Sequence, residues 1–351
     1  MTNNIDRVKS LWTESFNETE SWIDGFFRDF YREDTLDYFE NDGEMVCSLL
    51  RIPYRMNFQW SLVPMGYIMG ACTRKDCRKK GWMEKLLRNS LIDSYENGDL
   101  FMALIPRDRP LYFYYDKFDF ATVFYIKEDR YTSMHNFHGS GEFTPMTGLS
   151  AGLLDSFVRK IEEQMANRVV HSLGDLAGIL WDLKEDGGKV VAVGDTAVRG
   201  VAFVIPKEGE VVVRECLTVD DEKVLPDLLQ AVKNKYPEFD MVIERTPKPE
   251  DRALEARGML RIINVKRVLE KIATHHRALR QAIKIKDSLI PQNNHIFIID
   301  NGLVVENDDW KGKIDNEMDI KTLAEVLFNT SATGSLFGLP AHRPSMSLMM
   351  D

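Results

Sequence analysis

The sequence between residues 69 and 83 reads MGACTRKDCRKKGWM, and it says more about the fold than any other stretch of the chain. An apolar run typical of a strand precedes it, and five of the seven residues from Arg74 to Lys80 are basic. Apolar residues then return at helical spacing from Trp82. Backbone N–H groups at the start of a helix are unpaired and point outward, beside the positive end of the helix dipole. The stretch therefore predicts a strand, a basic loop and a helix whose start can cradle phosphate groups.

Gly81 strengthens this interpretation, because a residue without a side chain lets a ligand come close to the backbone. A plainer interpretation explains the same residues on physical grounds. In that interpretation the basic residues form a solvated turn in front of an ordinary helix. The residues alone give the two interpretations about equal weight.

The elements around this stretch predict a mixed sheet with helices packed on it. We expect helices and strands near residues 5–16, 22–30, 36–40, 45–52, 80–97, 100–105, 111–118 and 120–126. With the strand that ends at Cys72, the order is two helices, three strands, helix, strand, helix and strand. The following region, residues 127–150, is rich in His, Gly, Ser, Thr and Pro and is interpreted as a connection.

The rest of the chain repeats this layout once and then changes. Helices are expected near 153–165, 173–183 and 222–235, with strands near 189–193, 200–205, 211–216 and 241–244. The last part combines a helix from about residue 263, a hairpin turning at Asp300-Asn301-Gly302 and a helix over 320–328. At about 150 residues per domain the length suits two or three domains. We predict three: residues 1–145, 146–262 and 263–351.

Composition limits the functional classes. The chain has 351 residues, 44% of them hydrophobic and 28% charged, which excludes a disordered, collagen-like or membrane-embedded protein. It shows neither a membrane-length apolar run nor an apolar signal core, so we expect a cytoplasmic protein without a membrane partner. A net charge of −10 without a basic stripe predicts no nucleic-acid binding. Four cysteines without CxxC spacing or nearby histidines predict reduced thiols and no metal site.

Residues 78–83, RKKGWM, resemble the R/Q-x-x-G-x-G/A motif of the GNAT acetyltransferases. Met83 departs from the usual Gly or Ala, but a larger residue there is also seen in one branch, the enhanced-intracellular-survival (Eis) family of amine acetyltransferases. The resemblance implies acetyl-CoA as co-substrate. It places the pyrophosphate at Arg78, Lys79, Lys80, Gly81, Trp82 and Met83, and the pantetheine along a bulged strand end at Gly70, Ala71, Cys72 and Thr73.

Residues 110–121, PLYFYYDKFDFA, resemble the F-Y-x-K/R-F-G-F/Y segment of the same family, in which the tyrosine is the general acid. This alignment makes Tyr115 the catalytic acid and puts Asp119 at the usual glycine. A core position explains these aromatic residues as well, but three tyrosines within 112–115 cannot all be buried on one helix face. The aromatic residues of the first two helices have the same two explanations, an acceptor pocket or core packing.

A primary amine is charged at neutral pH and must lose a proton before it attacks, so the reaction needs a base. The motif regions offer no obvious one. In the resembled family the C-terminal carboxylate takes this role, which implies Asp351 here, although the chain ends SLMMD rather than in the family's common aromatic residue. The apolar composition of this tail favours docking over fraying.

The resemblance extends over the whole chain. It implies an α/β (α+β) fold with tandem GNAT-type mixed sheets, helices on both faces of each, the second domain being degenerate, and a C-terminal sterol-carrier-like α+β domain. The implied protein is an Eis-like N-acetyltransferase that acts by direct transfer in a ternary complex on a small-molecule amine and assembles as a homo-oligomer. Two alternatives stay open: a protein-lysine acetyltransferase, and a non-catalytic lipid- or acyl-CoA-binding protein.

Overall fold

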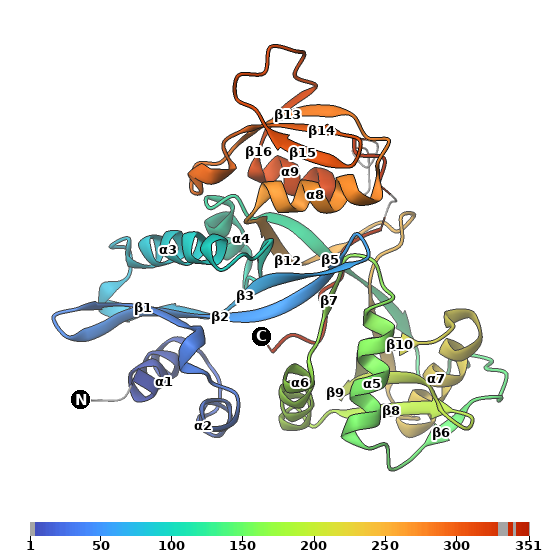
Figure 1. The fold of residues 1–351 in the computed structure, drawn as a ribbon. Helices are drawn as coiled ribbons and strands as arrows, with labels where there is room; N and C mark the ends of the chain where they lie inside the picture. Colours follow the sequence, from blue (N-terminus) through green and yellow to red (C-terminus); the bar gives the residue numbers. More distant parts are fainter. Residues whose placement is uncertain (1–3, 329–335, 340–341, 351) are drawn as a thin grey trace. The chain divides into compact units, whose positions relative to one another are not determined.

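The computed structural model describes residues 4–328, 336–339 and 342–350, and the chain divides into two compact units (Figure 1). Unit 1 contains residues 1–123 and 257–342, and unit 2 contains 124–256 and 343–350. Unit 1 is therefore built from two segments that are far apart in the sequence. Within the described ranges, no helix is long and apolar enough to span a bilayer.

The larger sheet of unit 1 has the strand order β1-β2-β3-β4-β12. Only β3 and β4 pair in parallel, and the other neighbours are antiparallel. The strands are β1 (Leu36–Asn41), β2 (Glu44–Phe58), β3 (Ser61–Thr73), β4 (Phe101–Leu104) and β12 (Glu255–Ile262). Figure 1 shows two helices on each face, namely α1 (Asn4–Ser15) and α2 (Glu20–Asp29) on one and α3 (Trp82–Glu96) and α4 (Arg109–Asp116) on the other.

The predicted order of the first nine elements is confirmed, from α1 to β5 (Ala121–Tyr131). Three short 3₁₀ turns, η1 (Glu33–Thr35), η2 (Lys75–Cys77) and η3 (Pro291–Asn293), complete unit 1. β5 runs further than predicted, because residues 127–131 pair with β11 instead of beginning a loop. The expected connection also contains a short strand, β6 (Thr144–Met146).

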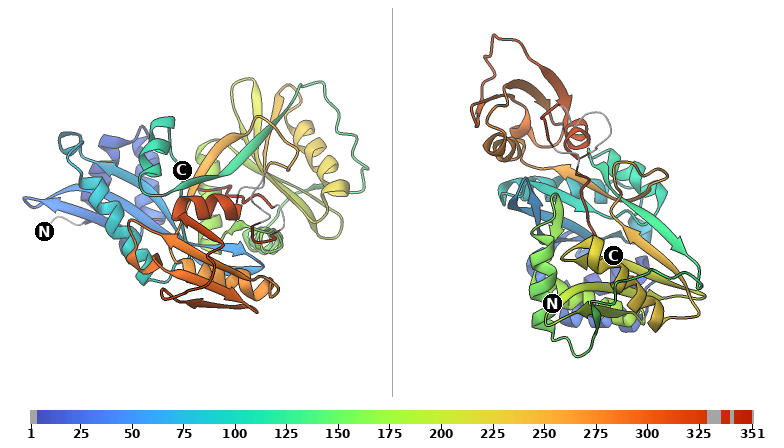
Figure 2. Two further views of the ribbon diagram at one scale, coloured as in Figure 1. Left: turned by 90° about the horizontal axis from the view of Figure 1, so that it is seen from above. Right: turned by 90° about the vertical axis from the view of Figure 1, so that its right-hand side faces the viewer.

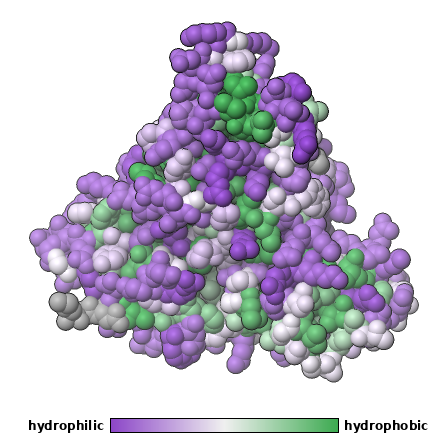
Figure 3. All heavy atoms as spheres, in the orientation of Figure 1, coloured by the Kyte–Doolittle hydropathy of each residue, from purple (hydrophilic) through white to green (hydrophobic). Residues whose placement is uncertain are grey.

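A second sheet in unit 1 has the order β15-β14-β13-β16. Its strands are β13 (Gln281–Lys286), β14 (Ile296–Asp300), β15 (Leu303–Glu306) and β16 (Asn316–Asp319), and α8 (Val265–His275) and α9 (Ile320–Phe328) cover one face (Figure 2). The predicted turn is confirmed: Asn301 and Gly302 take φ of +50° and +80°, which only a few residue types tolerate. Leu303 and Val305 on β15 are exposed. Figure 3 shows apolar surface near the top of the view.

Unit 2 is a sheet of order β5-β11-β10-β9-β8-β6. Its remaining elements are α5 (Ala151–Glu162), β7 (Arg168–Val170), α6 (Leu173–Glu185), β8 (Lys189–Gly194), β9 (Val198–Pro206), β10 (Glu210–Thr218), α7 (Asp221–Lys235) and β11 (Asp240–Arg245). Alternate residues of β9 enter two different cores: Val201 and Phe203 pack with α5 and α6, and Ala202 and Val204 pack with α7. This alternation is the period-2 pattern of a strand buried on both faces.

Candidate active site

The end of β3 is where the larger sheet of unit 1 opens. The parallel pairing of β3 with β4 ends at Ile68 and Leu104, but β3 continues to Thr73. Against β2 its register shifts between Ser48 and Leu50, which places one extra residue in β3 near Gly70. The backbone of residues 69–73 therefore extends beyond the ladder with β4.

Gly70 is required at this bulge for two reasons. Its φ of +62° lies in the left-handed region that glycine tolerates best. A Cβ at this position would also collide with the Trp12 ring of α1. The bulge predicted at Gly70, Ala71, Cys72 and Thr73 is thus present, and the indole of Trp12 covers one side of it.

A basic loop leads from this strand to α3. Arg78 folds back so that its Nε donates to the Thr73 carbonyl at 3.0 Å. Lys79 has φ of +62°, and the side chains of Arg78, Lys79 and Lys80 are exposed. Three cationic side chains are therefore available to solvent directly before the helix.

α3 begins without a side-chain cap. Its N-cap residue is Gly81, with φ of +81°, and nothing lies within 4 Å of the place where a Cβ would be. Trp82 and Met83 contribute the first N–H groups, which can donate hydrogen bonds to an anion. The Met83 side chain packs against the core that contains Leu86 and Leu87. The core therefore accommodates a side chain that is larger than the Gly or Ala of the resembled motif.

Tyr115 lies on α4, whose start is fixed by the Asp108 side chain accepting from the Leu111 N–H at 3.1 Å. The Tyr115 side chain is buried, and its ring contacts Tyr114 and Phe120 with centroids 5.4 and 6.0 Å apart. Burial, with smaller contributions from Tyr114 and Cys72, raises the pKa of the Tyr115 hydroxyl. The phenol therefore keeps its proton at neutral pH, which is the form that a general acid needs.

One apolar cluster brings the predicted segments together. Tyr115 belongs to it, and Ala71, Trp82 and Met83 pack against it. The strand end, the helix start and the tyrosine thus border the same core, although they lie in separate parts of the sequence.

Asp119 keeps the turn that glycine makes in the resembled segment. It adopts φ of +59°, which aspartate tolerates better than most residues. Its carboxylate lies 3.7 Å from Nη1 of the buried Arg261 and accepts from the Ser288 hydroxyl at 3.3 Å. Arg261 also donates to Asp287 at 2.7 Å. This ion network was not apparent from the sequence, because Arg261 pairs with residues from two other segments.

The same loop of the second sheet supports Tyr115 through apolar contacts. Leu289 and Ile290 are buried in the cluster that contains Tyr115 and Phe118. Asp287 holds this loop by accepting from both of their N–H groups, at 2.8 and 3.0 Å. The C-terminal part of unit 1 therefore helps to hold α4 in position.

The cysteines and the first two helices have a structural role. Burial raises the pKa of the Cys72 thiol to about 11, which disfavours the nucleophilic thiolate. Trp12, Trp22 and Phe26 are buried and stack on one another at 5.0–6.5 Å between centroids. Core packing, rather than an open acceptor pocket, accounts for these rings. Among the described residues, no group of three His, Cys, Asp or Glu side chains could hold a metal ion.

Asp351, the predicted base, lies outside the described residues. The tail before it is docked on unit 2: the Val169 N–H donates to the Ser345 carbonyl at 3.0 Å, and Leu348 packs with α5 and α6. A buried network, which sequence reasoning missed, holds this tail. Arg168 donates to Glu162 at 3.1 Å and to the Ser347 hydroxyl at 2.8 Å.

Comparison with known proteins agrees with this architecture. Residues 2–123 match the family described as an acetyltransferase (GNAT) domain, and residues 265–337 match the sterol carrier protein domain. No curated protein matches the sequence.

Solved structures extend the likeness over nearly the whole chain. A probable N-acyltransferase from Enterococcus faecalis has 15% identity and a TM-score of 0.77, covering 99% of this chain and 96% of its own. A GCN5-related N-acetyltransferase from Anabaena variabilis gives the same values. Eis1 from Mycobacterium abscessus has 14% identity and a TM-score of 0.72, covering 97% of this chain and 92% of its own. At these identities the likeness shows the fold.

Residues 2–123 are therefore similar to a GNAT acetyltransferase domain, and the chain shares its fold with solved N-acetyltransferases over nearly its whole length. Residues 265–337 are similar to a sterol carrier protein domain, and the fold of the whole chain is similar to that of Eis1.

Proposed function

We propose that the protein transfers an acetyl group from acetyl-CoA to the primary amine of a small molecule, within a ternary complex of enzyme, coenzyme and amine. The observation that carries this proposal is the convergence of three features on one core. These are the β3 bulge, the uncapped start of α3 and the buried Tyr115.

The residues present suit a CoA thioester. The pyrophosphate would accept from the first N–H groups of α3 and from the exposed Arg78 and Lys79 side chains, in charge-assisted hydrogen bonds. Gly81 leaves open space at this place. The pantetheine amides would pair with the free edge of residues 69–73 in the manner of an added strand.

In the proposed reaction the neutral amine nitrogen attacks the thioester carbonyl carbon, so that a C–N bond forms and the C–S bond breaks. An N–H group of the β3 bulge would stabilise the negative charge on the carbonyl oxygen. Tyr115 would give its proton to the departing CoA thiolate, the new amide nitrogen would lose its extra proton to solvent, and Tyr115 would recover a proton from solvent. The ammonium proton must pass to a base before attack, and Asp351 stays the prediction for this role.

A thiol-release assay with acetyl-CoA tests the proposal against a panel of polyamines, aminoglycosides and lysine peptides. We expect release that depends on small amines and is greatly reduced in Tyr115→Phe. If only the lysine peptides are acetylated, the acceptor would be a protein lysine rather than a small amine. Binding of acyl-CoA or lipid without turnover of any amine would refute transfer and favour a non-catalytic binding protein.

A further inference from the structure

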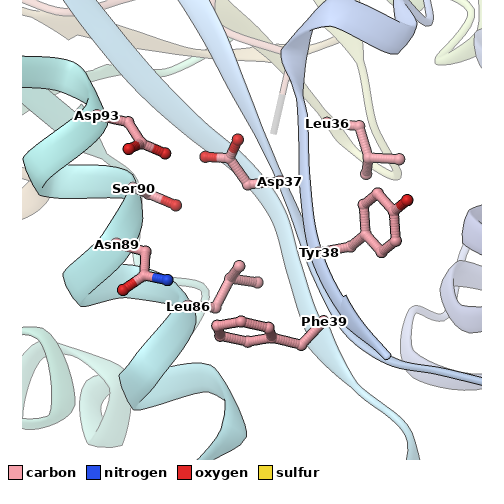
Figure 4. Close-up of a pocket in the computed structure, with 8 residues that line it drawn as sticks. All are labelled: Leu36, Asp37, Tyr38, Phe39, Leu86, Asn89, Ser90 and Asp93. Atoms are coloured by element: carbon pink, nitrogen blue, oxygen red, sulfur yellow. The ribbon is translucent and has the colours of Figure 1, made fainter. Parts of the chain in front are cut away.

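Unit 1 contains a cavity of about 250 Å³ between β1 and α3 (Figure 4). Asp37 and Phe39 of β1 point toward α3 in this view, whereas Tyr38 lies on the other side of the strand. The facing residues of α3 recur at helical spacing; they are Leu86, Asn89, Ser90 and Asp93. Lining residues recur every two positions on β1 and every three to four positions on α3, so one face of the strand and one face of the helix together form the walls of the cavity.

The polar end of this cavity is acidic. The carboxylates of Asp37 and Asp93 face each other, and the Ser90 hydroxyl points between them (Figure 4). Arg51 donates from Nε to Asp37 at 3.2 Å, which satisfies one of the two carboxylates. Within the described part of the chain no cation pairs with Asp93. One negative charge at the cavity is therefore uncompensated.

Ser90 supplies an independent sign of a ligand. Its side chain is about 99% buried, and its hydroxyl has no hydrogen-bond partner. An unpaired buried polar group costs roughly 1–3 kcal/mol, so its position in the wall of an acidic cavity calls for a donor from outside the chain. The opposite end of the cavity is apolar, formed by Leu86 and Phe39.

We propose that this cavity binds a small organic cation, a primary ammonium group that carries a short apolar chain. An ammonium has three donors and no acceptor, which matches the oxygens of Asp37, Asp93 and Ser90. The chain would lie against Leu86 and Phe39. An organic cation fits better than a metal ion, because the described residues hold no cluster of three metal-ligating side chains. The volume lies below the usual range for drug-sized ligands, about 300–1,000 Å³.

The polar end of the cavity lies away from the predicted coenzyme cradle, whereas the apolar end borders it, because the ring centroids of Phe39 and Trp82 are 6.2 Å apart. Asp93 follows Met83 by ten residues on α3, about 15 Å along the axis at 1.5 Å per residue. Binding here can therefore be measured without the coenzyme, and the result does not depend on acetyl transfer.

Calorimetry with pentylamine as probe and 1-pentanol as its uncharged match tests the proposal on the full-length protein. We expect pentylamine to bind at least ~10-fold more tightly than pentanol. Asp93→Asn, a change at an exposed residue, should weaken pentylamine at least ~10-fold, and Ser90→Ala should weaken it ~3-fold. Glu96→Gln removes another exposed carboxylate from the same helix and should leave binding unchanged. Thermal unfolding verifies that each variant is folded.

Acetyl-CoA affinity and acetyl transfer should stay unchanged in Asp93→Asn, which separates this site from the coenzyme site. Equal pentylamine affinity in Asp93→Asn and the wild type would overturn the proposal, because the amine would then be bound elsewhere. Equal affinities for pentylamine and pentanol would overturn the charge-based recognition. Absence of pentylamine binding at about 10 mM would overturn the site itself.

Discussion

Unit 1 and unit 2 each contain a bulged strand that leads into a 15-residue helix. β3 shifts register against β2 near Gly70, and β10 shifts register against β9 between Val213 and Glu215. Both strands then pair in parallel on their other side, β3 with β4 and β10 with β11. The backbone frame is thus closely similar, and the differences lie in the side chains that it carries.

The helix starts have opposite chemistry. α3 begins at Gly81, which offers no cap, after a run of exposed basic residues. α7 begins at Asp220, whose side chain accepts from the Lys223 N–H at 3.3 Å, and Asp221 and Glu222 occupy its first turn. A carboxylate therefore already satisfies one of the N-terminal donors of α7, and two more carboxylates would repel a phosphate. The comparison teaches that the residue at the N-cap decides whether the first N–H groups of this helix are already paired with a carboxylate.

The bulges differ in the same way. Gly70 leaves the β3 bulge without a side chain, whereas Glu215 at the β10 bulge is paired with Arg168 at 2.7 Å and accepts from the Ser347 hydroxyl. Unit 2 has thus filled this part of the frame with a buried ion network that holds the tail. In the described part of unit 1 the bulge has no such network, and the strand beyond Ile68 lies outside the ladder with β4.

The largest expected effect tests whether chemistry belongs to unit 1 alone. Tyr115→Phe keeps the ring and removes the hydroxyl, so turnover should fall ~10²- to 10⁴-fold, the usual range for a general acid, while acetyl-CoA affinity stays nearly intact. Steady-state kinetics and calorimetry measure the two quantities. Tyr236 lies at the C-terminal end of α7 in unit 2, and Tyr236→Phe, which removes the same hydroxyl group, is the control that should leave turnover unchanged. Near-normal turnover of Tyr115→Phe would return this tyrosine to a purely structural role.

The second prediction disrupts the network that is found only in unit 2. Burial alone would raise the pKa of Glu162, but His171 and Arg168 lower it to about 2 from an ordinary 4.5. Glu162→Gln leaves the buried Arg168 with one carboxylate fewer and should cost about 3–5 kcal/mol in the free energy of unfolding. Chemical denaturation followed by circular dichroism measures this loss. Unchanged stability would mean that the network contributes nothing to unit 2.

The same group gives the pH dependence. Because the pKa of Glu162 is lower in the folded state, its contribution to stability is complete above about pH 4.5 and is lost as the pH falls toward 2. We expect this acid-dependent loss in the wild type and a flatter profile in Glu162→Gln. Identical profiles would assign the acid sensitivity to other groups.

The smallest expected effect comes from exchanging the N-cap residues of α3 and α7. Gly81→Asp gives α3 the kind of residue that begins α7, and its carboxylate would repel the pyrophosphate. Acetyl-CoA affinity should fall at least ~10-fold, equivalent to about 1.4 kcal/mol. Asp220→Gly makes the converse change and should leave that affinity unaltered. If calorimetry gives the same coenzyme affinity for Gly81→Asp and the wild type, the start of α3 does not bind the pyrophosphate.

Local patterns in the sequence predicted the elements that obey them. The order from α1 to β5, the strand, basic loop and helix around Arg78, and the turn at Asn301 and Gly302 all follow from periodicity or turn chemistry. Two central strands were missed, β12 and β13. In β12 the reason is Arg261, which interrupts an apolar run and is usually a sign of exposure, yet it is fully buried here.

The tertiary structure alone decided what Arg261 does. Its charge is tolerated in the core because Asp287 and Asp119, from two separate segments, form ion pairs with it. Asp119, which stands where the resembled family has glycine, thereby has a partner for its carboxylate. Arg168 likewise depends on Glu162, Glu215 and the distant Ser347. The acidic cavity with Asp37 and Asp93 also exists only because α3 packs beside β1. The sequence by itself determined the elements and the chemical character of each motif, because these are properties of neighbouring residues. Which charges meet, and which polar groups stay unpaired, depended on contacts between distant residues that only folding creates.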